Sequence, residues 1–367
     1  MIHKLPQTVL LAGVFAACLS LVSCGGGGTN MFRGNASHNG QMASSGPTEL
    51  NALAWKYVLP DKIYSSPLAG DREVYIGCNN GYLYAIDQAT GLEKWKFRTD
   101  NNIESTPALV DGMLYVGSWD KHVYAIDTET RAVRWKFPTT GPVSSSPVVS
   151  DGVVYIGSED GHMYAIEAAT GYEKWRFKAS GAIYSSPALN QEHVFFGTLS
   201  GDLFAVNIRS GQEYWRYHTR AKIHSSPAVD ERQVYFGGDD KHVYAVNIKT
   251  GQLSWDKKTA GEVLSSPAID GDSLFIGSKD GYVYAYDTGN GSRRWEFRTE
   301  GPVYAPPVLA SGTVYVGSSD GHLYALDKGR GTLRWKYKTE DKIYSSPSVK
   351  DGKIFFNSVD GSLYAVQ

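Results

Sequence analysis

Eight tryptophans divide the chain into equal units. They are Trp55, Trp95, Trp135, Trp175, Trp215, Trp255, Trp295 and Trp335, and they follow one another every 40 residues without an insertion or a deletion. A fixed period of this length is typical of solenoids and propellers, in which each repeat buries its apolar face against its neighbours. The repeats account for most of the 367 residues, so we expect one large repeat domain.

Each unit reads as four short strands. In the third copy they cover residues 143–149, 153–157, 162–167 and 172–177, which are segments of alternating apolar residues. Asp151-Gly152 and Asp160-Gly161 separate three of them, and such pairs are typical of tight hairpins whose two central residues both have positive φ. The four strands are therefore predicted to be successive antiparallel neighbours.

The first strand of each unit carries small side chains. Its sequence is Ile-Tyr-Ser-Ser-Pro where it begins at Ile63, Ile183 and Ile343. Small residues suit the strand nearest the axis of a propeller, where the sheets converge, and a proline without an N–H suits an edge strand. The tryptophan strand is then expected at the outer edge, with Trp95 and Phe97 on the same face.

The two ends of the repeat region complement each other. Residues 52–58 form a tryptophan strand that precedes the first complete unit, and residues 363–367 form a third strand with which the chain ends. The last blade therefore needs a fourth strand, and the N-terminal one would close the ring and cover both edges. We predict an all-β fold, an eight-bladed β-propeller of four-stranded antiparallel blades over residues 48–367.

The N-terminus reads as a lipoprotein signal peptide over residues 1–23. Its apolar run from Val9 to Val22 is too short for a stable membrane span. Leu21-Val22-Ser23-Cys24 resembles the bacterial lipobox, and the resemblance implies lipidation of Cys24 and attachment to a bilayer. A secretory signal peptide with an incidental cysteine is the alternative. By resemblance to a lipoprotein sorting rule, Gly25 implies the outer membrane, and we expect the periplasmic face rather than the cell surface.

Residues 24–47 would join this anchor to the propeller. They are rich in Gly, Ser and Asn and have no periodicity, so we expect a flexible tether. Cys18 would leave with the signal peptide and Cys24 would be acylated, which leaves Cys78 as a small packed residue and allows no disulfide framework within one mature chain.

Net charge argues against one class of partner. Lys and Arg number 36 against 38 Asp and Glu, which gives a net charge of −2. No overall electrostatic attraction to a polyanion results, so nucleic acid is not expected as a partner.

Three segments carry a resemblance to a known family. "AIDQATGLEKW" (85–95), "AIEAATGYEKW" (165–175) and "AVNIKTGQLSW" (245–255) resemble the tryptophan-docking motif of the pyrroloquinoline-quinone (PQQ) type propeller repeats. That family implies the propeller fold over about 320 residues. It includes PQQ-dependent alcohol dehydrogenases and non-enzymatic, BamB-like lipoproteins of the outer-membrane β-barrel assembly machinery, so the shared fold does not decide the function.

Candidate binding residues are those that differ between repeats, because residues common to every repeat serve folding. Two slots vary: the second position of the innermost strand and the turn between the second and third strands. With the loops between blades they give a candidate partner-binding face at the mouth of the channel, made of Tyr64, Glu104, Trp119, Glu159, Lys222, His224, Lys279 and Lys342. His122, His162, His242 and His322 share one slot on different blades and are not expected to bind a metal.

No catalytic motif occurs in the sequence. It lacks the adjacent cysteine pair of the quinone enzymes, a Cys-x-x-Cys-His haem site, a nucleophile elbow and a Walker loop. We therefore expect a non-enzymatic, monomeric scaffold without a cofactor, lipid-anchored in the cell envelope, whose protein partners the family resemblance places in β-barrel assembly. The alternatives are a redox propeller that binds PQQ with calcium, and a surface adhesin or glycan binder that uses the tyrosine-rich mouth.

Overall fold

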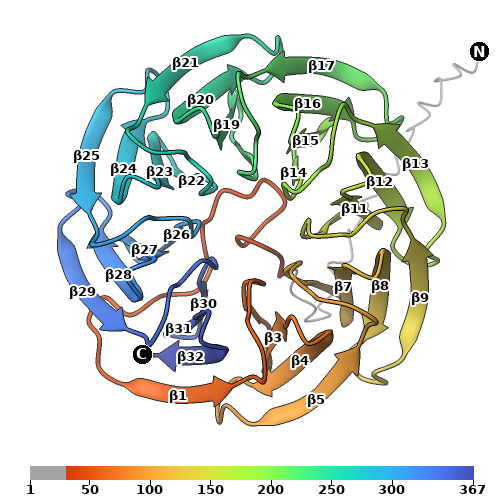
Figure 1. Cartoon of the computed structure of the whole chain (residues 1–367), viewed down its shortest axis with the longest axis horizontal. Helices are drawn as coiled ribbons and strands as arrows, with labels where there is room; N and C mark the ends of the chain where they lie inside the picture. Colours follow the sequence, from red (N-terminus) through yellow and green to blue (C-terminus); the bar gives the residue numbers. More distant parts are fainter. Residues whose placement is uncertain (1–29) are drawn as a thin grey trace, which may run out of the picture.

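Each repeat forms one four-stranded antiparallel sheet, and eight of these sheets stand as blades around a central axis (Figure 1). The computed structural model describes residues 30–367. The signal peptide, Cys24 and the first part of the expected tether lie outside the described residues. No helix in residues 30–367 has the length and apolar character needed to cross a membrane.

The blades are numbered in chain order, and their strands run from the axis outward. Blade one contains β2 (Leu68–Ala69), β3 (Glu73–Gly77), β4 (Tyr82–Asp87) and β5 (Glu93–Arg98), and blade two contains β6 (Ala108–Val110), β7 (Met113–Ser118), β8 (His122–Asp127) and β9 (Val133–Pro138). Blade three contains β10 (Val148–Ser150), β11 (Val153–Gly157), β12 (His162–Glu167) and β13 (Glu173–Lys178), and blade four contains β14 (Ala188–Leu189), β15 (His193–Gly197), β16 (Asp202–Asn207) and β17 (Glu213–His218).

The second half of the ring repeats the pattern. Blade five contains β18 (Ala228–Val229), β19 (Gln233–Gly237), β20 (His242–Asn247) and β21 (Leu253–Lys258), and blade six contains β22 (Ala268–Asp270), β23 (Ser273–Gly277), β24 (Tyr282–Asp287) and β25 (Arg293–Arg298). Blade seven contains β26 (Val308–Ala310), β27 (Thr313–Gly317), β28 (His322–Asp327) and β29 (Leu333–Lys338). Blade eight contains β30 (Ser348–Lys350), β31 (Lys353–Asn357) and β32 (Ser362–Val366), with β1 (Leu53–Val58) as its outer strand.

The ring closes as the sequence predicts. β1 pairs antiparallel with β32, so that the first and last strands of the chain share blade eight. Trp55 lies opposite Ala365 there, in the same register that places Trp95 opposite Ala85 in blade one. The predicted eight-bladed propeller is confirmed, and closure gives blade eight its fourth strand and covers the edge of β32.

The repeat tryptophans join neighbouring blades. Trp175, for example, donates from Nε1 to the Ile208 carbonyl of the next blade at 3.0 Å. It also packs on Gly211, which has a φ of +70°, and a Cβ at this position would lie only 2.7 Å from the indole ring, so both features favour glycine. Seven tryptophans make such an Nε1 hydrogen bond: Trp55, Trp135, Trp175, Trp215, Trp255, Trp295 and Trp335.

The innermost strands are shorter than predicted. Residues 143–149 were expected to be the first strand of blade three, but β10 covers only Val148–Ser150. Residues before it bond around the axis rather than within the blade: the Ser146 N–H donates to Ser186 Oγ of blade four at 2.9 Å. The blades converge closely at the axis, where their small side chains form a hub. In this hub, hydrogen bonds between blades replace the hydrogen-bond ladder within a sheet.

One of the two predicted hairpin types is also corrected. Asp151 and Gly152 have φ values of 49° and 71°, as a two-residue turn with positive φ requires. In the second turn only Gly161 has positive φ, at 81°, and its N–H bonds to the Ser158 carbonyl at 3.0 Å. The Asp160 side chain fixes this turn instead, because it accepts hydrogen bonds from the His162 N–H and the Tyr164 hydroxyl.

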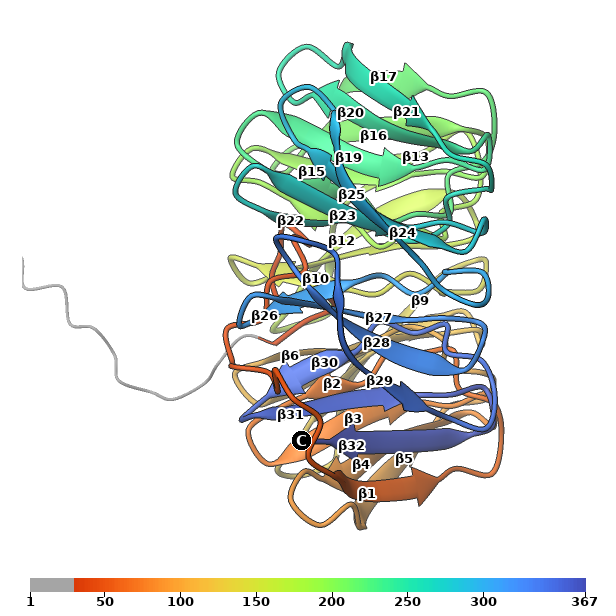
Figure 2. The ribbon, with the colours of Figure 1, turned by 90° about the vertical axis from the view of Figure 1, so that its left-hand side faces the viewer.

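Residues 30–47 do not form the expected flexible tether. They are bonded to the propeller, and residues 30–42, which we call the plug, cross the middle of the ring (Figure 1). The plug lies at the face that carries the turns between first and second strands, and the side view shows it at one end of the ring (Figure 2). We call this the plug face and the opposite one, with the turns between second and third strands, the mouth face.

The rest of this segment completes blade eight. Because that blade receives its outer strand from the N-terminus, it has no turn on which the preceding tryptophan could dock. The Pro47 carbonyl takes the place of that turn and accepts hydrogen bonds from Trp335 Nε1 at 3.1 Å and from the Tyr315 hydroxyl at 3.0 Å.

Candidate functional site at the mouth of the channel

The two variable slots of the repeat lie side by side on the mouth face. In blade two the Trp119 N–H donates to the carbonyl of Asn102, two residues before Glu104, at 2.9 Å. Equivalent hydrogen bonds join Glu159 to Pro142 and Lys279 to Glu262, each at 2.9 Å. A backbone frame therefore holds side chains that differ from blade to blade around the axis of the ring.

Blades two to five form an acidic sector of the mouth. The Trp119 indole donates to Ser144 Oγ at 2.9 Å, and Ser144 Oγ donates to Glu159 Oε1 at 2.8 Å. Trp119 was considered either an exposed anchor or an aromatic side chain packed on its neighbours. It is half-buried and bonded to the neighbouring blade, so it is not a fully exposed anchor.

Glu104 is the unusual carboxyl of this sector. Burial, and then the charge of Glu159, raise its pKa to about 7. Next to it, burial and then a hydrogen bond to Glu159 raise the pKa of Tyr184 to about 12. Two carboxyl groups thus share a partly desolvated space, which favours either a bound proton or a cationic group from a partner.

His224 continues the acidic sector in blade five. Its Nδ1 lies 3.0 Å from both Oδ1 and Oδ2 of Asp239, and its ring makes an edge contact with Tyr184 at a centroid distance of 6.1 Å. The aspartate fixes the orientation of the imidazole.

A tyrosine sector occupies the other side of the mouth. The Tyr64 and Tyr344 rings are stacked with centroids 6.4 Å apart, and Tyr304 meets Tyr344 edge-on at 5.1 Å. Lys279 is bonded to Glu262 at 2.6 Å and lies over the Tyr304 ring. This sector offers aromatic faces with polar hydroxyl ends, a combination common in binding surfaces.

Lys222 and Lys342 stand at the rim, and both are exposed. Among the ion pairs of residues 30–367, neither lysine takes part. Their ammonium groups are therefore available to an acidic partner.

The four histidines that share one slot are bonded to aspartates. His122, His162 and His322 lie 3.0–3.3 Å from the aspartate two residues earlier, and His242 lies 2.7 Å from Asp256. Within residues 30–367, no three side chains of His, Cys, Asp or Glu gather closely enough to bind one metal ion.

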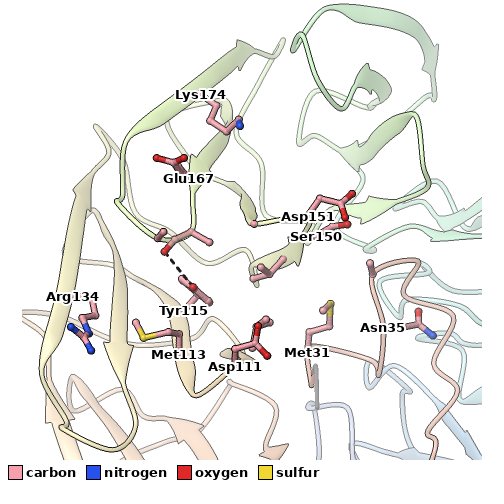
Figure 3. Close-up of a pocket in the computed structure, with 16 residues that line it drawn as sticks. Met31, Asn35, Asp111, Met113, Tyr115, Arg134, Ser150, Asp151, Glu167 and Lys174 are labelled. Atoms are coloured by element: carbon pink, nitrogen blue, oxygen red, sulfur yellow. Dashed lines mark hydrogen bonds between the residues drawn. The ribbon is translucent and has the colours of Figure 1, made fainter. Parts of the chain in front are cut away.

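A cavity lies on the plug face, outside the sequence-based expectations. It is a cavity of about 940 Å³ between the plug and blades two and three, and Figure 3 shows Met31, Asp111 and Asp151 around it. Lys174 and Arg134 lie further out, and Arg134 is paired with Asp127 at 2.6 Å. The cavity is open, its lining mixes charges of both signs with apolar side chains, and we assign it no chemistry.

The plug is the part of the molecule that sequence reasoning missed. Met31 and Phe32 are buried apolar residues, and Arg33 and His38 are buried polar residues, in a segment expected to be solvated. Two adjacent apolar residues next to an arginine, in an otherwise polar linker, were the available signal.

Comparisons with known proteins agree with this architecture. A family model described as "Beta-alanine-activating enzyme, beta-propeller" matches residues 150–367. A comparison with curated proteins found no match. Among solved structures, BamB from Moraxella catarrhalis is similar with a TM-score of 0.74 and 16% identity, over 86% of this chain and 99% of that one.

Two further structures show how widely the fold is used. The quinohemoprotein alcohol dehydrogenase from Comamonas testosteroni has a TM-score of 0.80 and 14% identity, over 92% of this chain and 80% of that one. The computationally designed Ika8 protein has a TM-score of 0.76 and 19% identity, over 87% and 99% of the two chains. At these identities the likeness concerns the fold alone.

Proposed function

The chain belongs to the β-propeller family described as that of the beta-alanine-activating enzyme. From this premise we propose that the chain is a non-enzymatic binding platform. In this proposal it is lipid-anchored in the bacterial cell envelope, and its mouth face holds a protein partner. The resemblance of its repeats to those of BamB-like lipoproteins supports assembly of outer-membrane β-barrel proteins as the setting.

The path of the N-terminal segment carries this proposal. Asn30 is bonded to Leu109 on the plug face, and only six residue steps separate it from Cys24. Such a stretch spans at most about 20 Å. A bilayer that holds an acylated Cys24 would lie close to the plug face, and the mouth face would then point away from the membrane, toward a partner.

The mouth face has the composition of a protein-binding surface. Its backbone frame is hydrogen-bonded, its variable side chains include tyrosines and the half-buried Trp119, and Lys222 and Lys342 are free to meet acidic groups. Neighbouring acidic and aromatic sectors give the surface a polarity that could fix the orientation of a partner.

Site-specific photo-crosslinking in intact cells tests the proposal. A photoreactive amino acid is placed at Lys222 or Lys342 on the mouth face and, as a matched control, at Thr170, which is exposed on the plug face. We expect one protein to be captured from both mouth positions but not from Thr170. A charge-reversed Lys222→Glu and Lys342→Glu chain, labelled at Tyr64, should capture less than a tenth as much.

Anchoring is tested separately with Cys24→Ala. We expect this variant to move from the membrane fraction to the soluble fraction. Capture from Thr170 alone, or equal capture from all positions, would refute the assigned face, and a membrane-bound Cys24→Ala variant would refute the anchor.

A further inference from the structure

The plug is a segment that runs across several innermost strands and is held to them by backbone hydrogen bonds. The N–H groups of Leu189, Val229, Ile269 and Leu309, from four consecutive blades, donate to the carbonyls of Ala36, Ser37, Asn39 and Gly40 at 2.7–3.0 Å. Because these donors lie on the innermost strands, nothing else in residues 30–367 bonds to them from the channel side. Backbone hydrogen bonds therefore hold the plug across the axis of the ring.

Two polar side chains of the plug are buried, and most of their nitrogen atoms have no hydrogen-bond partner among the described residues. Arg33 is 2% exposed and His38 is 0% exposed. Arg33 Nη2 donates to the Pro267 carbonyl, but Arg33 Nε and Nη1 and both ring nitrogens of His38 have no hydrogen-bond partner among the described residues. Burying polar groups in this way opposes docking of the plug.

The charged groups around His38 do not compensate a second positive charge. Arg33 is the charged neighbour on the plug itself, and burial lowers its pKa to about 9, so it remains protonated near neutral pH. His38 lies between residues bonded to β18 and β22. The carboxylates next to those strands are engaged elsewhere: Asp230 accepts hydrogen bonds from Gln233 and Tyr235, and Asp270 is paired with Lys328.

We propose that the plug is a detachable stopper, docked while His38 is neutral and released when His38 takes up a proton. Release uncovers the hub on the plug face and frees the N–H groups of five innermost strands, including that of Leu109, for pairing with an extended segment. The proposal does not depend on lipid anchoring or on a partner at the mouth face.

The sign of the pH effect follows from linkage. Burial and the Arg33 charge hold the pKa of His38 well below its usual range in the docked state, whereas a released His38 would titrate near about 6.5. The released state therefore binds more protons as the pH falls below that value. Docking is strongest above about pH 6.5, and its equilibrium constant should fall about tenfold for each pH unit below that value, until the docked histidine itself titrates.

Pulsed electron–electron double resonance, which measures the distance between two spin labels, tests the proposal on the full chain. Nitroxide labels are attached at Ala36→Cys in the plug and at Ala89→Cys, an exposed turn residue of blade one, with Cys18 and Cys24 replaced by serine and the buried Cys78 retained. We expect one narrow distance distribution at about pH 7.5 and a growing broad, longer component as the pH falls to about 5.

Variants separate this switch from general acid unfolding. His38→Phe and His38→Gln cannot be protonated at this site, so their distributions should stay the same across the pH range. Arg33→Met should weaken the pH dependence, because burial alone then acts on His38, and His322→Gln on the mouth face should retain the full dependence. A wild-type distribution that does not change with pH, or an unchanged pH dependence in both His38 variants, would overturn the proposal.

Discussion

At the scale of single residues, Trp95 is bound differently from the other repeat tryptophans. It is the one for which no Nε1 hydrogen bond is present in residues 30–367. The turn on which it would dock carries Arg131 where the equivalent turns carry a glycine, and Arg131 has a φ of 61°. A side chain in this left-handed conformation costs about 1 kcal/mol relative to glycine.

Arg131→Gly should therefore stabilise the protein by about 1 kcal/mol, because it relieves the backbone and lets Trp95 approach the turn as the other tryptophans do. Scanning calorimetry should show a rise of about 2 °C in the unfolding midpoint. Gly171→Arg in blade three is the matched reverse change. Its new Cβ would lie 2.7 Å from the Trp135 ring, so its midpoint should fall by more, and a gain from this change would contradict the explanation.

At the scale of structural elements, hydrogen bonds between serines join the innermost segments of successive blades. The Ser186 N–H donates to Ser226 Oγ, and the Ser226 N–H donates to Ser266 Oγ, each at 2.9 Å. The pattern is interrupted in blade seven, where Pro306 has neither the hydroxyl acceptor nor the N–H donor. Ser346 Oγ donates to the Pro306 carbonyl instead, at 3.2 Å.

Pro306→Ser should complete the ring of serine hydrogen bonds. It restores an acceptor for the Ser266 N–H and a donor for Ser346 Oγ, and one net hydrogen bond is worth about 1 kcal/mol. Chemical denaturation should show this gain in the free energy of unfolding. Ser146→Ala is the comparison: it leaves the Thr106 N–H, now bonded at 3.0 Å, without its partner and should cost about 1–2 kcal/mol. Equal stability of all three chains would rule out a stabilising ring.

At the scale of the whole molecule, the N-terminal region has two separable roles. β1 supplies the outer strand of blade eight, whereas the plug closes the hub from the plug face. The first role is needed for the ring itself, because without β1 the edge of β32 would be free to pair with another chain. The second adds hydrogen bonds to a ring that is already closed.

Truncations should separate these roles. A chain that begins at residue 46 keeps Pro47 and β1, and we expect it to elute from size-exclusion chromatography as a folded monomer. A chain that begins at residue 59 lacks β1 and should associate or aggregate through the β32 edge. If the shorter chain were also a stable monomer, strand closure would not be what holds the ring together.

The sequence by itself determined the ring. The 40-residue spacing of Trp55 to Trp335, the glycine turns and the complementary ends specify eight blades, their strand order and their closure, because each of these depends on local periodicity and on nearest neighbours. Sequence comparison between repeats also identified Tyr64, Glu104 and Glu159 as residues of one face, since equivalent positions in a ring share a face.

Only the tertiary structure decided how those residues combine and where the N-terminal segment goes. The raised pKa of Glu104 depends first on its burial and then on the charge of Glu159 from another blade, and no spacing within one repeat reveals either of them. The plug binds five blades through its backbone carbonyls, and a carbonyl is the same for every residue type, so this contact leaves almost no pattern in the sequence. The mouth face and plug face are distinguished by that contact.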